Sequence, residues 1–394
     1  MTQRLKIRCA KLLDEYLGGI LIWLCRRLCR RRPLADTDRK ILFIKFWGIG
    51  SIVLSEPAVR WLRRHYEEWE IHYLTLSENS ELFEMLPGVT RVHHVRFHDP
   101  VRFISDSLRL LRRLRQERYQ LVFDAEFFAN YSTILAWLTQ APGIVGFSRG
   151  CSAKSRLLDV GVVFLDRLHT SRQFLNLVQQ GVNNGTGPPR PSIMLPDATL
   201  LSRWPFLQEG YIVMNINASS LALERRWPRD RFIQLADYLL ATFDTHLILI
   251  GSKNEAGYVK PLTQALSQFE RLHDLTGQAT LSELALLIRD AVCLISNDSG
   301  PIHLASALNT PTVGFYGPET PQRYGPLSSR KLLFYRELWC SPCMSVENAK
   351  TVNCINQLAC MREIQVNHVC TKVDAFINGL DWGKKRQKRV LINV

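Results

Sequence analysis

The N-terminal part of the sequence lacks an apolar run long enough to cross a bilayer. The apolar segment at residues 16–25 (YLGGILIWLC) has ten residues, whereas a membrane-spanning helix needs about 20. A signal peptide is also a poor match, because Asp14 and Glu15 precede the segment and an arginine-rich stretch without a small-residue cleavage site follows it. We therefore expect a protein that is not exported, in which the ten cysteines are reduced thiols.

The body of the chain has little net charge. The formal net charge is +14, but residues 1–40 hold eleven Lys/Arg against four Asp/Glu, and residues 384–389 (KKRQKR) add five basic residues. A nucleic-acid-binding enzyme usually carries its basic residues as a patch on the folded body, so this distribution argues against nucleic acid as a partner. It favours an anionic membrane surface, at about 1 kcal/mol per basic residue near the headgroups.

Apolar residues near the N-terminus recur at helical spacing. They are Leu13, Tyr16, Leu17, Ile20, Leu21, Leu24 and Leu28. Together with Trp23 and the flanking arginines, they predict an amphipathic helix that lies in the headgroup region. The alternative is a helix that packs on the body of the protein. The membrane interpretation predicts a cytoplasmic protein that is peripheral at the inner face of the plasma membrane.

Segments that resemble strands and helices alternate along the chain, which predicts an α/β fold with parallel sheets. The predicted strands lie at 41–46, 71–76, 89–95, 120–123 and 143–147, and again at 211–216, 246–250, 291–296 and 311–315. The Gly- and Pro-rich residues 183–191 (NNGTGPPRP) separate the two series and indicate a linker. The length of 394 residues also suits two domains better than one core.

These features give a predicted domain organisation. The amphipathic helix and a basic linker occupy residues 1–39, one Rossmann-like domain 40–182, a linker 183–210, a second Rossmann-like domain 211–383, and a basic tail 384–394. Ligands of such folds bind beyond the carboxyl ends of the strands. We therefore expect the two domains to enclose a binding cleft.

The most specific motif is NDSGPIH at residues 297–303, which follows a predicted buried strand and opens a helix. Pro301 suits the first helical turn, and Gly300 allows close approach of a ligand to the backbone. The unpaired amides of the helix N-terminus form an anion site. His303 can donate to a phosphate oxygen. The alternative is an ordinary helix capped by Ser299, which leaves Asp298 and His303 unexplained.

Two further segments follow predicted strands of the same domain. Ser219 and Ser220, with Arg225 and Arg226 close behind, could bind a diphosphate; the alternative is a solvated loop. Glu255 follows a later strand and could accept the hydroxyls of a ribose, although helix N-termini commonly carry Glu.

The chain resembles glycosyltransferase family 9, the lipopolysaccharide heptosyltransferase-like enzymes with a GT-B fold, over about residues 40–380. The resemblance rests on IKFWGIGS (44–51) with Pro57, on residues 217–228, and above all on NDSGPIHLASALNTPTVGFYGPETPQRYGP (297–326). It implies an inverting hexosyl- or heptosyltransferase that uses a nucleoside-diphosphate sugar and no catalytic metal or other cofactor. The donor residues that it implies are Ser219, Ser220 and Arg225 with Ser299, Gly300 and His303 for the diphosphate, Asp298 for the sugar and Glu255 for the nucleoside.

The chain departs from this resemblance in the acceptor-side loop, which contains Gly48, Gly50 and Ser51. Heptosyltransferases carry an aspartate, their proposed general base, where this chain has Ser51. A serine cannot deprotonate a sugar hydroxyl unaided. Glu126, which follows a strand end, is the preferred replacement, and Asp124 lies two residues before it and so faces the same side of an extended strand. Glu56 is a further candidate; strand-end capping is the alternative for Asp124 and Glu126.

Four cysteines lie in or near a Cys-rich loop at residues 340–360. They are Cys340, Cys343, Cys354 and Cys360. Four thiolates suit a structural zinc or an iron–sulfur centre, but only the first pair has CxxC spacing. Reduced cysteines in a polar loop are the alternative.

The sequence thus predicts an inverting glycosyltransferase that transfers a sugar from a nucleoside-diphosphate sugar to a lipopolysaccharide or another lipid-linked cell-surface glycan at the inner membrane face. Two alternatives stay open. One is a sugar-nucleotide epimerase or hydrolase with a GT-B fold, which would act without an acceptor. The other is a non-catalytic sugar-nucleotide-binding protein, which the serine at position 51 allows.

Overall fold

The computed structural model describes residues 3–28, 31–33, 39–96, 100–127, 129–148, 152–180, 187–218, 222–345 and 352–380. The chain divides into two compact units, residues 1–194 and 195–394. The division falls within residues 183–210, where the sequence predicts a linker.

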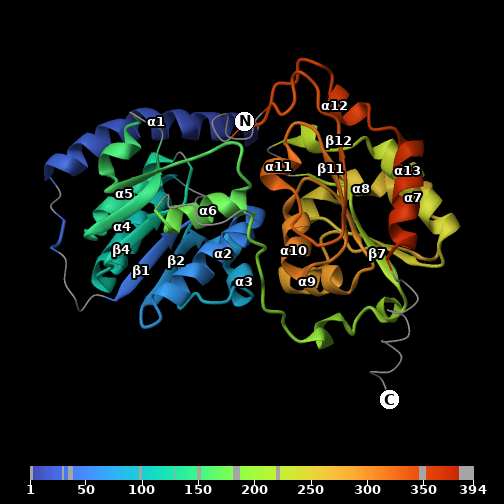
Figure 1. Ribbon diagram of the computed structural model, residues 1–394, viewed down its shortest axis with the longest axis horizontal. Helices are drawn as coiled ribbons and strands as arrows, with labels where there is room; N and C mark the ends of the chain where they lie inside the picture. The colour runs from blue at the N-terminus through green and yellow to red at the C-terminus, as the bar shows by residue number, and fades with distance from the viewer. Residues whose placement is uncertain are drawn as a thin grey trace. The chain divides into compact units, whose positions relative to one another are not determined.

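The first unit is built on a six-stranded parallel sheet in the order β3-β2-β1-β4-β5-β6 (Figure 1). Its strands are β1 (Lys40–Ile44), β2 (Glu70–Leu76), β3 (Arg91–Val95), β4 (Leu121–Asp124), β5 (Gly143–Ser148) and β6 (Val160–Val163). Its main helices are α1 (Gln3–Leu28), α2 (Ile49–His65), α3 (Ser80–Glu84), α4 (Pro100–Glu117), α5 (Asn130–Leu138) and α6 (Thr170–Val178).

The second unit contains a six-stranded parallel sheet in the order β12-β11-β10-β7-β8-β9. Its strands are β7 (Tyr211–Asn215), β8 (His246–Leu249), β9 (Leu272–Asp274), β10 (Leu294–Asn297), β11 (Thr312–Tyr316) and β12 (Lys331–Tyr335). Its helices are α7 (Arg229–Thr242), α8 (Ala256–Ala265), α9 (Leu281–Asp290), α10 (Gly300–Leu308), α11 (Pro321–Tyr324), α12 (Ala359–Arg362) and α13 (Val366–Asn378).

Both sheets have the same strand order when each is counted along its own chain segment. In each, the order reverses between the first and fourth strands, which are β1 and β4 in the first unit and β7 and β10 in the second. This topological switch point is where ligands bind in open α/β sheets, beyond the carboxyl ends of the strands. Most candidate residues of the sequence analysis follow these four strands, whereas Glu255 follows β8 and the four cysteines follow β12.

The predicted pair of parallel α/β sheets is confirmed. The nine predicted strands are all present, within a few residues of their predicted limits, and their central residues are buried in two apolar cores. The sequence analysis missed β6, β9 and β12, which lie at sheet edges. Edge strands are partly exposed, so they lack the continuous apolar run that marks a buried strand. It also missed α6 and α13.

Helix α1 packs along α5 (Figure 1). Its contact face contains Ile22 and Cys25, which join a small apolar cluster with Ile134 of α5. The carboxylate of Asp14 accepts hydrogen bonds from the backbone N–H groups of Asn130 and Tyr131, at 2.8 and 2.9 Å. Asp14 thereby caps the N-terminus of α5. No helix in the described part of the chain combines the length and apolarity that a membrane span requires.

Candidate functional site

The turn between β10 and α10 leaves the N-terminus of α10 without a side-chain cap. Ser299 occupies the N-cap position, but its hydroxyl makes no capping hydrogen bond. Instead, Ser299 Oγ accepts from Asn215 Nδ2 at 2.8 Å. A methyl group added at Gly300 would meet no atom within 4 Å. Open space at an uncapped helix N-terminus is the arrangement that binds an anion.

Two asparagines at the switch point hold the surrounding loops. Asn215, at the end of β7, also donates to Ser296 Oγ at 3.0 Å. Asn297, at the end of β10, accepts from the backbone N–H of Trp227 at 2.9 Å. It donates to the carbonyl of Ile216 at 2.9 Å. The sequence analysis gave these asparagines no role, because only the β7–β10 pairing brings their loops together.

Arg225 and Asp298 form a buried ion pair, with Arg225 Nη1 at 3.2 Å from Asp298 Oδ2. Arg226 stacks its guanidinium 3.8 Å from the ring centre of Tyr258, and burial lowers its pKa. The Nε atoms of both arginines are buried and make no hydrogen bond to any described residue. A buried guanidinium N–H without an acceptor is unfavourable, so both donors are suited to an anionic ligand.

The remaining predicted donor residues divide into three groups. His303 is buried in the first turn of α10, and its ring lies edge-on to Tyr324. Glu255 takes part in a capping box, because its Oε2 accepts from the N–H and hydroxyl of Ser252 at 2.8 and 2.9 Å. Ser219 and Ser220 lie outside the described residues.

In the first unit, Glu126 lies against the loop that joins β1 to α2. Its Oε1 accepts from the backbone N–H groups of Phe46 and Trp47, at 2.5 and 3.2 Å. Lys45 Nζ lies 2.9 and 3.0 Å from the two carboxylate oxygens, and both side chains are buried. Glu126 therefore contacts the loop that contains Gly48, whereas Gly50 and Ser51 lie in the first turn of α2 rather than in the loop that the sequence predicts. Gly48 has φ of 86° and ψ of 100°, a backbone conformation that favours glycine.

The two other carboxylates are anchored elsewhere. Asp124 is fully buried at the end of β4, pairs with Lys154 Nζ at 2.9 Å and accepts from the hydroxyl of Thr133. Glu56, buried in α2, accepts from the N–H of Ser192 at 2.8 Å and from its hydroxyl at 3.2 Å. Burial raises the pKa of Glu56. Lys45 and Lys154 are site residues that the sequence analysis missed, because the pairing of β1 with β4 and the fold of a distant loop bring them to these carboxylates.

The four cysteines gather near the end of β11. Burial, followed by the charges of Cys343, Cys354 and Cys340, raises the pKa of Cys360 to about 11, so the four thiols are close enough to influence one another. No three cysteine sulfurs among the described residues lie within ligand distance of a common ion. The metal therefore stays a prediction.

Comparisons with known proteins identify the family of the chain. The family model "Glycosyltransferase family 9 (heptosyltransferase)" matches residues 107–352. Lipopolysaccharide heptosyltransferase 2 of Escherichia coli (strain K12) is 26% identical over 312 residues, which cover 74% of this chain and 86% of that protein.

Two solved structures show the same fold. E. coli ADP-heptose lps heptosyltransferase II aligns with a TM-score of 0.71 at 20% identity, over 86% of this chain and 99% of that chain. The bacterial iron-containing dodecameric glycosyltransferase TibC, from enterotoxigenic E. coli H10407, aligns with a TM-score of 0.52 at 15% identity, over 89% of this chain and 77% of that chain.

Two Rossmann-like units of identical strand order form a GT-B-like α/β fold, which the solved heptosyltransferase structure shares. The family model covers more than half of the chain. The chain belongs to glycosyltransferase family 9, and the predicted fold, enzyme class and family are confirmed.

Proposed function

We propose that the protein is an inverting glycosyltransferase that transfers a sugar from a nucleoside-diphosphate sugar to a lipopolysaccharide or another lipid-linked cell-surface glycan. One observation carries the donor assignment: the uncapped N-terminus of α10 adjoins the buried pair of Arg225 and Asp298. The names of the relatives, which refer to lipopolysaccharide and ADP-heptose, support the same donor and acceptor classes.

In this proposal, the diphosphate of the donor lies against the first turn of α10 at Ser299, Gly300 and His303. The amides of that turn and the guanidinium of Arg225 stabilise the negative charge that develops on the leaving group. Such preorganised donors act without reorganisation, since Asn215 and Asn297 already hold the loops in place. Asp298 faces the donor sugar. Ser219, Ser220 and Arg225 would hold the second phosphate, with Arg226 beside them. Glu255 would bind the nucleoside.

Glu126 is the proposed general base. Of the three candidate carboxylates, it is the one that is hydrogen-bonded to the β1–α2 loop, at Phe46 and Trp47. Asp124 and Glu56 would then hold Lys154 and Ser192 in place rather than contact the acceptor. The proposed reaction is a single displacement. The acceptor hydroxyl loses its proton to Glu126, its oxygen bonds to the anomeric carbon, and the nucleoside diphosphate leaves.

Helix α1 is the proposed contact with an anionic membrane surface. Its exposed apolar residues include Leu17 at 54%, Ile20 at 60% and Trp23 at 51% exposure. These belong to the predicted stripe or flank it, whereas Ile22 and Cys25 face α5. Packing on the body and contact with a membrane thus use different faces of one helix. Arg26 and Arg27 would contact the headgroups, and the enzyme would act at the inner face of the plasma membrane.

The cysteine cluster is proposed as a structural metal site without a catalytic role. The residues present fit such a group in donor chemistry, since four thiols from two segments gather beside Gly317. Cys340, Cys343, Cys354 and Cys360 would hold a zinc ion or an iron centre, and the iron in TibC supports the second choice.

A thermal-shift screen of ADP-, GDP-, UDP- and dTDP-sugars tests the donor site. We expect at least one to raise the Tm of the wild-type protein and of a His368→Ala control, because His368 is exposed on α13 in the same unit. The shift should disappear in His303→Ala. Failure of every sugar nucleotide to bind would contradict the proposal. Release of free sugar without an acceptor would instead favour the hydrolase or epimerase alternative, and binding without turnover would favour the non-catalytic one.

A further inference from the structure

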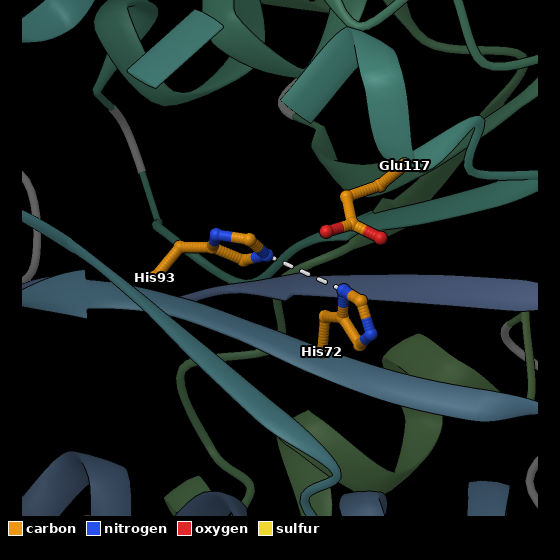
Figure 2. A group of neighbouring side chains, drawn as sticks. All are labelled: His72, His93 and Glu117. Carbon is orange, nitrogen blue, oxygen red and sulfur yellow. Dashed lines mark hydrogen bonds between the residues drawn. The ribbon is translucent and has the colours of Figure 1, made fainter. Parts of the chain in front are cut away.

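A cluster of potential metal ligands lies in the first unit, away from the carboxyl ends of the strands. It consists of His72 on β2, His93 on β3 and Glu117 at the end of α4. Their side chains point toward one another (Figure 2). The candidate ligand atoms all lie within 4.8 Å of one another. None of these residues belongs to the proposed donor or acceptor site.

The orientation of His72 is fixed by a carboxylate. Its Nε2 lies 2.9 Å from Glu70 Oε2. Because a carboxylate accepts, Nε2 carries the ring proton, and Nδ1 presents its lone pair to the cluster. A metal-binding histidine typically donates its other N–H to a carboxylate or carbonyl, which sets the tautomer and the ring orientation. Burial lowers the pKa of both imidazoles, to about 4 for His93, so both are neutral near pH 7.

In the absence of an ion, Tyr119 links the two histidines, because its hydroxyl can donate to His72 Nδ1 and accept from His93 Nε2. His72 Nδ1, His93 Nε2 and the hydroxyl of Tyr119 form a triangle with edges of 2.8, 2.8 and 3.3 Å. With His72 Nδ1 unprotonated, the three atoms share at most two protons, one on Tyr119 and one on His93. The third edge, between the two ring nitrogens, is then left without a proton of its own.

The separation of those two nitrogens matches a metal site. Two nitrogens that bind one Zn²⁺ tetrahedrally at about 2.0–2.1 Å lie about 3.3–3.4 Å apart. The observed separation of His72 Nδ1 and His93 Nε2 is 3.3 Å. The neutral tautomer of His93 that carries its proton on Nδ1 would present a second lone pair, on Nε2, to the ion. Glu117 is held nearby by Lys40 at 2.7 Å and by Arg91 at 2.5 Å.

We propose that His72, His93 and Glu117 form a structural binding site for a divalent transition-metal ion such as Zn²⁺. The charges of Glu70 and Glu117 are balanced by Lys40 and Arg91, so the site offers little excess negative charge. Binding must therefore come from the nitrogen ligands, which favours Zn²⁺ or Co²⁺ over Mg²⁺ or Ca²⁺. A bound ion would join edge strand β3 to β2 and to the end of α4.

Cobalt and zinc titrations of the full chain test this site. The protein is first freed of metal by a chelator, in a background where Cys343→Ser and Cys354→Ser remove the thiolate cluster. Co²⁺ should then bind with one equivalent and show d–d bands without thiolate charge transfer. His93→Gln should weaken binding at least about tenfold. His94→Gln is the matched control, since His94 is the exposed neighbour on the same strand, and it should bind as the parent does.

A second variant tests the same site in case the His93→Gln protein fails to fold. In Glu117→Gln the substitution lies at a helix end, so we expect the Tm of the metal-free protein to stay within a few degrees of the parent. This variant should bind Zn²⁺ more weakly. Zn²⁺ should no longer raise its Tm. Equal binding by the His93→Gln and His94→Gln proteins, or no binding by the parent, would overturn the proposal. Neither result depends on glycosyl transfer, so the proposed function is tested separately.

Discussion

Arg225 and Asp298 come from loops 73 residues apart and meet as a buried ion pair of 3.2 Å at the switch point of the second sheet. The pair gives Arg225 a fixed position beside the N-terminus of α10 before any ligand arrives. Its Nε makes no hydrogen bond to any residue in the described segments. A donor diphosphate would supply the missing acceptor.

Replacement of Arg225 should therefore impair the use of the donor. We expect Arg225→Met to lower kcat/KM by about 10²–10³, the usual effect of removing one preorganised charge-stabilising donor. Arg226→Met should have a smaller effect, since Arg226 is held by stacking on Tyr258. Steady-state kinetics and donor titration by calorimetry measure both. If Arg225→Met bound the donor as tightly as the wild type and kept its kcat/KM, Arg225 would not be a donor-site residue.

Substitutions at Lys45 and Glu126 can distinguish a catalytic role of Glu126 from a structural one. If Glu126 is the base, Glu126→Gln should lower kcat by about 10²–10⁴ with little change in KM for the donor. It should also destabilise the protein, because it breaks the buried ion pair in which Lys45 Nζ lies 2.9 and 3.0 Å from the carboxylate oxygens, at a cost of about 3–5 kcal/mol.

The double variant Lys45→Met/Glu126→Gln decides between the two roles. It should recover much of the stability, since both charges of the buried ion pair are removed together. Activity should stay low if Glu126 is the base. Recovery of kcat together with the free energy of unfolding would mean that Glu126 serves only as the counter-ion of Lys45.

Glu56 should influence stability as a function of pH. Its folded pKa lies above the unfolded value of 4.5, chiefly because it is buried, so above pH 4.5 the unfolded chain loses this proton before the folded one does. The stabilisation from protonated Glu56 is thus present below pH 4.5 and is lost as the pH rises through the folded pKa. Glu56→Gln, which does not titrate, should show a higher Tm than the wild type at pH 7 and no difference at pH 4. A thermal scan across this range measures it, and unchanged transferase activity would separate Glu56 from the base role.

The exposed face of α1 should bind anionic vesicles. We expect Leu17→Glu/Ile20→Glu to lose co-sedimentation with vesicles that contain phosphatidylglycerol, because two charges oppose burial of the apolar face. The Tm should change little, since both side chains are exposed. Val163→Glu is the control, because Val163 is 64% exposed on β6 of the same unit. Equal vesicle binding by both variants would argue against α1 as the contact.

The sequence by itself determined the class of fold and the strand-to-helix turn at residues 297–303. Alternating apolar strands and amphipathic helices specify parallel sheets locally, and the NDSGPIH turn forms a strand end and a helix start from adjacent residues. These features depend on contacts between near neighbours, so they can be read from a window of about ten to twenty residues. The edge strands β6, β9 and β12 were missed because partial exposure weakens that local pattern.

Only the tertiary structure decided which side chains meet. Lys45 reaches Glu126 because β1 pairs with β4, and Asn215 reaches Ser299 because β7 pairs with β10. His72 and His93 face each other because β2 and β3 are neighbours. Strand order depends on the packing of all segments at once, so the spacing of residues along the chain does not encode these pairs in any local form.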